Sequence, residues 1–183
     1  MPLKAFVKVG SITNLSDARY CAGMGVDMLG FCTTEGRENY VKPGQYQEIR
    51  GWINGPLVVA EVYGIRNPNE LIEIIENYKP NYVEMSLGEL VFFSSLPLPL
   101  ILSIQENDVI NNLSIQPEFV ICKKVFETPF PLLLEIKSKL EVKSLLENQY
   151  VKGFVLQGTT EIKPGLKDYE AITDVLELLD VED

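Results

Sequence analysis

The chain has 183 residues, with 16 lysines and arginines against 26 aspartates and glutamates, so its formal net charge is −10, and it has no histidine. Without an imidazole it cannot build a Ser-His-Asp or Cys-His nucleophile, an H-E-x-x-H zinc site or a histidine pH switch. The negative balance disfavours non-specific binding to nucleic acid or to an anionic membrane, because both need a positive surface.

The composition and the cysteines predict one cytoplasmic domain over residues 1–183. A hydrophobic share of 46% with 23% charged residues is typical of a globular protein. Cys21, Cys32 and Cys122 show no C-x-x-C spacing, so we expect no disulfide framework, no metal site and a reducing compartment. No stretch approaches roughly 18 consecutive apolar residues, so we expect neither a signal peptide nor a membrane span.

Short apolar runs alternate with amphipathic stretches, which is typical of βα units around a parallel sheet. In the first half we expect strands at 5–9, 27–32, 57–63 and 82–86. Helices are expected at 14–24, capped by Asn14 or Ser16, at 43–53 and at 88–94. A further helix opens at Asn67-Pro68, with its apolar stripe at Leu71, Ile74, Ile75 and Tyr78.

The second half repeats this alternation with one interruption. We expect strands at 100–104, 119–125, 132–136 and 153–157, and helices at 107–113, 140–148 and 169–179. The segment 126–135 (FETPFPLLLE) contains two prolines, so no helix is expected there. Eight strands with about seven helices predict a minimal (βα)₈ TIM barrel in which the sixth helix is reduced or absent.

Residues 7–31 (VKVGSITNLSDARYCAGMGVDMLGF) match the pattern K-I-C-G-I-T-x-x-x-D-A followed by G-A-D-x-x-G-F. Residues 40–43 match Y-V-x-P, and residues 161–168 match E-x-x-P-G-x-K-D. In these segments the chain resembles the phosphoribosylanthranilate isomerase family, a TIM barrel of tryptophan biosynthesis. Between residues 65 and 151 only the order of strands and helices carries the resemblance. The matching residues are Lys8, Ile12, Thr13, Asp17, Ala18, Gly25, Asp27, Gly30, Phe31, Tyr40, Val41, Pro43, Glu161, Pro164, Gly165, Lys167 and Asp168.

The chain differs from this family at the positions to which the resemblance assigns the catalytic roles. The family's general base, a cysteine, aligns with Gly10, and its general acid, an aspartate, aligns with Lys123 or, one residue earlier, with Cys122. The histidine of the family's V-Q-L-H-G strand end is Ser86, and Glu135 stands where the family has a Gly-Gly turn. The resemblance implies no cofactor, and the reaction it implies is an aldose-ketose (Amadori) isomerisation.

Because side chains alternate faces along a strand, several charged residues could point into the barrel mouth. The alternative is that the lysines pair with the acids only to neutralise them. Cys32 could act as a base if a lysine lowered its pKa, and Glu84 or Glu135 could act as acid or base if burial raised theirs. The candidate catalytic residues are Lys8, Cys32, Glu84, Lys123 and Glu135. The candidate pocket residues are Ser11, Arg37, Glu61, Ser86 and Gln157, and the candidate phosphate site is Gly158, Thr159 and Thr160.

Three functions remain open at this point. The preferred one is a diverged barrel that lacks the usual isomerase mechanism and binds a small molecule, which could carry a phosphate, at its C-terminal face. The second is an active phosphoribosylanthranilate isomerase with reassigned acid and base. The third is a non-catalytic scaffold or regulatory barrel. We expect a monomer or a homodimer, and the apolar cluster of Phe92, Phe93, Leu96 and Leu98 is either a dimer interface or core.

Overall fold

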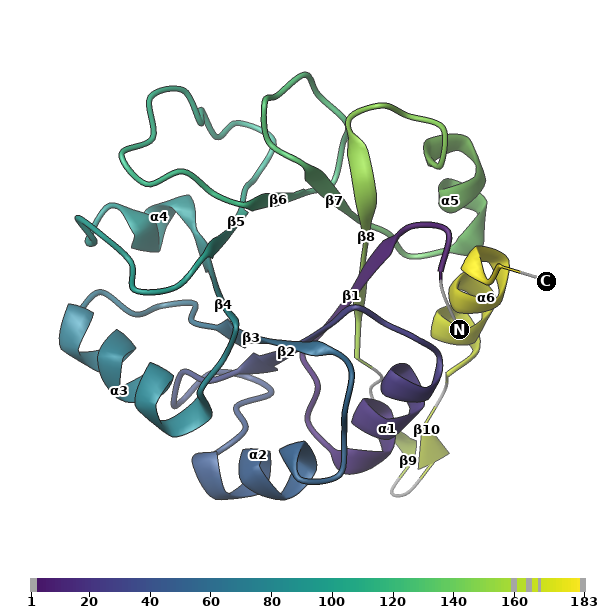
Figure 1. Cartoon of the computed structure of the whole chain (residues 1–183), viewed down its shortest axis with the longest axis horizontal. Coiled ribbons are helices and arrows are strands. Elements are labelled where there is room, and N and C mark those ends of the chain that lie inside the picture. The colour runs from purple at the N-terminus through teal and green to yellow at the C-terminus, as the bar shows by residue number, and fades with distance from the viewer. Residues whose placement is uncertain (1–2, 159–160, 164–165, 168, 182–183) are drawn as a thin grey trace.

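The computed structural model describes residues 3–158, 161–163, 166–167 and 169–181. Its centre is a closed barrel in which each strand pairs in parallel with the next and the eighth pairs with the first (Figure 1). This confirms the predicted TIM barrel. The strands are β1 (Phe6–Gly10), β2 (Met28–Cys32), β3 (Leu57–Glu61), β4 (Tyr82–Ser86), β5 (Leu100–Ser103), β6 (Phe119–Cys122), β7 (Leu132–Glu135) and β8 (Val151–Gln157).

Helices surround this barrel unevenly. They are α1 (Leu15–Gly23), α2 (Pro43–Arg50), α3 (Pro68–Tyr78), α4 (Leu87–Leu90), α5 (Lys139–Leu145) and α6 (Glu170–Leu179). Two short antiparallel strands, β9 (Glu161–Lys163) and β10 (Leu166–Lys167), precede α6, and the sequence analysis did not anticipate them. None of the helices within the described ranges is long and apolar enough to cross a membrane.

The predicted caps explain where the early helices begin. The Asn14 side chain accepts a hydrogen bond of 3.0 Å from the Asp17 amide and starts α1. The Asn67 side chain does the same for the Asn69 amide at 3.0 Å and starts α3, with Pro68 in its first turn. Each cap satisfies an amide that has no partner inside its helix. Gly25, which follows α1, has a φ of +78° that favours glycine.

One predicted helix is wrong, and it lies between β5 and β6. Residues 107–113 form no helix, and the Asp108 carboxylate accepts the Gln105 amide at 2.8 Å and closes a local turn instead. Asn112 has a φ of +63°, which a right-handed helix cannot contain. The segment after β6 also forms no helix, as its prolines predicted. Loops therefore replace the helices outside β5 and β6 (Figure 1).

The barrel separates two layers of apolar side chains. Outward residues such as Val7, Phe31 and Val83 belong to the layer that packs beneath the helices and loops, and Phe93 is buried in this layer, with Leu96 and Leu98 packed against it. Phe92, by contrast, is exposed. The inward layer fills the barrel with Met28, Val59, Ile101, Phe119, Ile121, Leu133 and Val155.

Candidate functional site

Three charged side chains that the sequence placed on inward strand positions meet inside the barrel. Lys8 on β1 lies with its Nζ 2.7 Å from Glu61 Oε1 on β3 and 2.8 Å from Glu84 Oε2 on β4. All three are buried. Tyr63, which follows β3, donates its hydroxyl to Glu84 Oε1 at 2.6 Å. We call Lys8, Glu61, Glu84 and Tyr63 the ion cluster.

Two glycines make room for the ion cluster. A Cβ atom at Gly10 would lie 2.7 Å from Glu61 Oε1 and 3.0 Å from Lys8 Nζ. A Cβ atom at Gly30 would lie 2.1 Å from Glu61 Oε1. The Ser11 amide completes the site by donating to Glu61 Oε2 at 3.1 Å. The buried carboxylate of Glu61 therefore occupies the space that side chains at positions 10 and 30 would need.

The electrostatics of the ion cluster fix which groups carry protons. Burial alone would lower the pKa of Lys8, but the charges of Glu61 and Glu84 outweigh it and raise this pKa above its ordinary value. Burial raises the pKa of Glu84, although Lys8 opposes the shift. Burial, followed by the charge of Glu84, raises the pKa of Tyr63. The two glutamates therefore favour the charged form of the Lys8 ammonium.

Cys32 does not meet the condition for acting as a base. It is buried at the end of β2, and burial raises the pKa of its thiol, with a further contribution from the charge of Glu61. The backbone at Thr34 and the charge of Arg37 oppose this shift without reversing it. A lysine was to lower this pKa if Cys32 were a base, but Lys8 already pairs with two glutamates, and burial raises the pKa of the thiol instead.

The structure leaves Lys123 and Glu135 out of the ion cluster. Lys123 follows β6 and is exposed, and Glu135 ends β7 half-buried. Neither forms an ion pair with any residue in the described part of the chain. Gln157 ends β8 beside Gly10 and is also exposed. These three residues lie at the carboxyl ends of their strands, where ligands of TIM barrels bind.

Three other candidate pocket residues make local structural contacts. Ser11 adopts a φ of +54° that turns its amide toward Glu61. Arg37 donates from Nε to the Tyr63 carbonyl at 3.2 Å. Ser86 caps α4 by accepting from the Gly88 amide at 3.2 Å and by a reciprocal bond with Glu89.

The candidate phosphate site is described only at Gly158. Its amide donates to the Gly10 carbonyl at 2.7 Å, so this amide is not free to bind an anion. Thr159 and Thr160 lie outside the described residues.

Tyr63 is the member of the ion cluster that sequence analysis missed. It follows Glu61 by two positions, so the alternation of strand faces placed it on the same side. The alternation of strand faces therefore indicated the position of Tyr63. An aromatic residue at the end of an apolar strand is, however, also typical of the hydrophobic core. Within the described ranges, no three Cys, Asp or Glu side chains gather as metal ligands.

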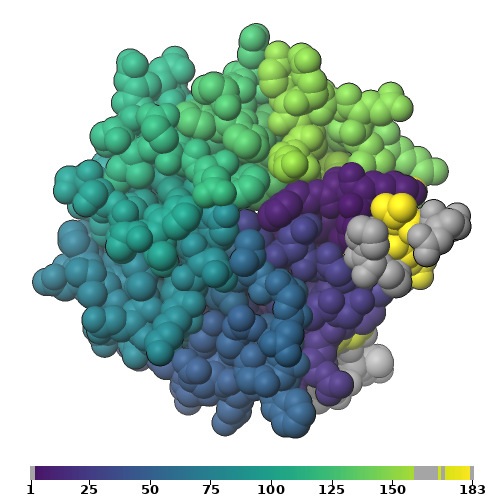
Figure 2. Space-filling model, in the orientation of Figure 1, coloured from purple at the N-terminus to yellow at the C-terminus, as the bar shows by residue number. Residues whose placement is uncertain are grey.

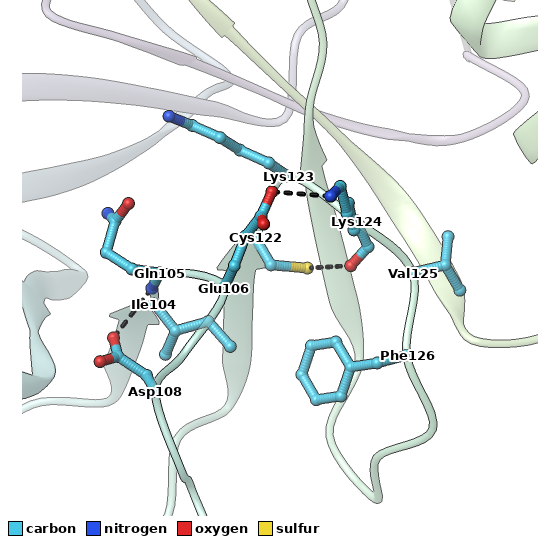
Figure 3. A pocket seen from close by; sticks show the side chains of 9 residues that line it. All are labelled: Ile104, Gln105, Glu106, Asp108, Cys122, Lys123, Lys124, Val125 and Phe126. Atoms are coloured by element: carbon cyan, nitrogen blue, oxygen red, sulfur yellow. Dashed lines mark hydrogen bonds and ion pairs between the residues drawn. The ribbon is translucent and has the colours of Figure 1, made fainter.

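The cavities lie beside the barrel rather than over the ion cluster. One of about 320 Å³ is lined by Cys122 at the end of β6 and by residues of the loops after β5 and β6, among them Ile104 and Phe126 (Figure 3). A neighbouring cavity of about 550 Å³ continues along the same loops and shares Asp108 and Phe126 with it. Viewed along the barrel, side chains occupy the centre of the ring (Figure 2).

Solved structures with similar folds are phosphoribosylanthranilate isomerases. The enzyme from Thermotoga maritima shares 17% identity over 94% of this chain and 97% of its own, with a TM-score of 0.73. The enzyme from Thermus thermophilus shares 15% over 94% and 96%, with a TM-score of 0.74. A third, at 16% identity over 94% and 97% and a TM-score of 0.73, was solved with reduced 1-(o-carboxyphenylamino)-1-deoxyribulose 5-phosphate. No protein-family model matches the chain, and no curated protein matches it significantly. Likeness at these identities establishes the fold.

Proposed function

We propose that this chain is a phosphoribosylanthranilate isomerase-like barrel that does not catalyse the Amadori isomerisation and that binds a small molecule at the carboxyl ends of its strands. We place it in the cytoplasm, as a monomer or a homodimer. The three free cysteines are buried, which is compatible with a reducing compartment.

The observation that carries this proposal is the position of Glu61. The resemblance assigns the general base to a cysteine at position 10, but Gly10 stands there with Glu61 Oε1 only 2.7 Å from where its Cβ would be. A side chain at position 10 would therefore require the Glu61 carboxylate to shift, and Glu61 is held in place by Lys8 and the Ser11 amide. The acid is missing as well, because the position that the resemblance assigns to an aspartate holds Lys123 or, one residue earlier, Cys122.

The ion cluster does not supply replacements. Lys8 holds its proton, and the Glu84 carboxyl already contacts Lys8 and the Tyr63 hydroxyl. A general acid or base must reach the substrate within hydrogen-bonding distance, and Lys8, Glu61 and Glu84 are buried. The groups that remain for a ligand are the exposed Lys123, which follows β6, the half-buried Glu135 at the end of β7 and the exposed Gln157 at the end of β8.

The first test is a turnover assay with phosphoribosylanthranilate on the purified, folded chain. We expect no conversion above the uncatalysed rate and no rescue of a bacterial strain that lacks this isomerase. Turnover that disappears in Glu84→Gln would overturn the proposal in favour of a reassigned isomerase.

The second test concerns the ligand site and uses ribose 5-phosphate as the probe, followed by amide chemical shifts in NMR. We expect saturable shifts at the carboxyl ends of β6 to β8 that weaken at least about tenfold in Lys123→Ala, because an exposed unpaired cation attracts the phosphate. Lys143→Ala on α5, also exposed, is the matched control and should bind normally. Shifts that are absent, or equal in both variants, would contradict this site.

A further inference from the structure

The cavity of about 320 Å³ beside β5 and β6 lies outside the barrel wall. Ile104 and Cys122, which line it, belong to the outward apolar layer, whereas Ile121, next to Cys122, faces the barrel interior. The residues of the ion cluster do not line it. The space arises where the helices after β5 and β6 are replaced by loops.

The walls of this cavity are mainly apolar. Ile104 and Cys122 form one side, and Val125 and Phe126 come from the loop after β6. Figure 3 shows the Phe126 ring directed toward Ile104 and Cys122, while Lys123 extends away from it. The Cys122 thiol contacts the Lys124 carbonyl at 3.2 Å, so it has a polar partner within its own loop.

The charged groups at the rim cancel. Lys124 pairs with Glu106 at 2.9 Å, and this ion pair joins the loop after β6 to the loop after β5 above Cys122 (Figure 3). Lys123 and Asp108 add one charge of each sign. The lining residues therefore carry no net formal charge, and the side chain of Lys123 extends away from the apolar walls (Figure 3), so these walls favour neither an anion nor a cation.

We propose that this cavity is a binding site for a neutral, apolar molecule with one or two rings. Its volume suits such a ligand, because an apolar cavity of roughly 150 Å³ already holds benzene and small-molecule sites begin near 300 Å³. The Phe126 ring offers a face or an edge for stacking. The Lys124–Glu106 pair does not seal the site, since both side chains are exposed and exposed ion pairs are weak.

The experiment uses 2-naphthol as the neutral probe and 2-naphthoate as its anionic counterpart, titrated into the whole chain by calorimetry and by methyl NMR. We expect saturable binding of 2-naphthol, with shifts at the Ile104 methyl and none at Ile72, which is exposed on α3. We expect 2-naphthoate to bind at least about tenfold more weakly, because a rim without net charge does not compensate the free-energy cost of desolvating a carboxylate.

Val125→Phe should fill the cavity and weaken 2-naphthol binding at least about tenfold. Val91→Phe is the matched control, because Val91 is 73% exposed and lies outside the cavity lining. The proposal is overturned if 2-naphthol fails to bind, if the Ile104 methyl does not shift, if Val125→Phe binds as well as the control, or if 2-naphthoate binds equally well. If Val125→Phe does not fold, the methyl shifts of the unaltered chain still test whether 2-naphthol binds in this cavity.

Discussion

At the residue scale, the ion cluster places one cation between two carboxylates in the barrel interior. Removing one member of a buried ion pair leaves an uncompensated charge, which costs far more than the pair itself contributes. The Lys8 ammonium is 1% exposed, so water cannot take over its role. Loss of the Lys8 ammonium should therefore lower the free energy of unfolding of the whole domain.

We expect Lys8→Met to lower the free energy of unfolding by about 3–5 kcal/mol, because Glu61 and Glu84 would remain buried without their cation. The triple variant with Glu61→Gln and Glu84→Gln should recover a large part of this loss. Urea denaturation followed by circular dichroism measures both. Lys4→Met, at an exposed position, is the control and should change stability by less than about 0.5 kcal/mol.

The alternation of strand faces was enough to predict that Lys8, Glu61 and Glu84 point inward. It was not enough to predict that they meet, because contact depends on the registers that pair Lys8 with Met28, Cys32 with Glu61, and Glu61 with Glu84. The same argument wrongly grouped Lys123 with them. β6 ends at Cys122, so Lys123 leaves the barrel wall instead of continuing it.

At the element scale, α4 shows how a helix of one turn is held in place. The Glu89 carboxylate accepts the Ser86 amide at 2.9 Å and the Gly64 amide at 2.9 Å, so it joins the loop after β3 to the end of β4. Partial burial alone would raise the pKa of Glu89, but the hydrogen bonds from Ser86 and Gly64 lower it below its ordinary value.

We expect Glu89→Gln to lower the free energy of unfolding by about 0.5–1 kcal/mol at pH 7, a modest value because the side chain is half-buried. A lowered pKa in the folded state stabilises the fold above the ordinary pKa of 4.5, and this contribution is lost as the pH falls through the folded value. The difference between the two proteins should therefore shrink below pH 4.5 in thermal unfolding.

Glu73→Gln, on the exposed side of α3, is the control and should show no such pH-dependent difference. A constant difference between Glu89→Gln and the unaltered chain from pH 7 to pH 3 would contradict the role given to this carboxylate.

Helices with a strong cap and an apolar stripe were predictable, and α1 and α3 begin where Asn14 and Asn67 indicated. The expected helix at 107–113 had only weak periodicity. This segment forms no helix, and the Asp108 side chain accepts a hydrogen bond from the Gln105 amide and so competes with helical hydrogen bonding.

At the scale of the whole molecule, the barrel is closed but its outer cover is uneven. β1 to β3 are each followed by a helix of eight or more residues, whereas loops cover β5 and β6. Local opening is easier where fewer packed contacts must be broken. The sequence predicted part of this asymmetry through the prolines after β6.

We expect amide hydrogens of β5 and β6 to exchange at least about tenfold faster than those of β1 and β2, because loops protect them less than helices do. Hydrogen exchange followed by mass spectrometry measures this. Equal protection around the ring would show that the loops pack as firmly as the helices they replace.

The pairing of β1 with β8 has a consequence for how the chain folds during synthesis. Five successive register pairs, from Phe6 with Gly153 to Gly10 with Gln157, form this seam, and a Cβ at Gly153 would lie 1.9 Å from the Phe6 carbonyl oxygen. At about 5–20 residues per second, β8 leaves the ribosome roughly 7–30 s after β1. Until then the nascent sheet has two unpaired edges, which is a condition that recruits chaperones. The barrel therefore cannot close before β8 is translated, and a side chain at position 153 would clash with the β1 backbone in this seam.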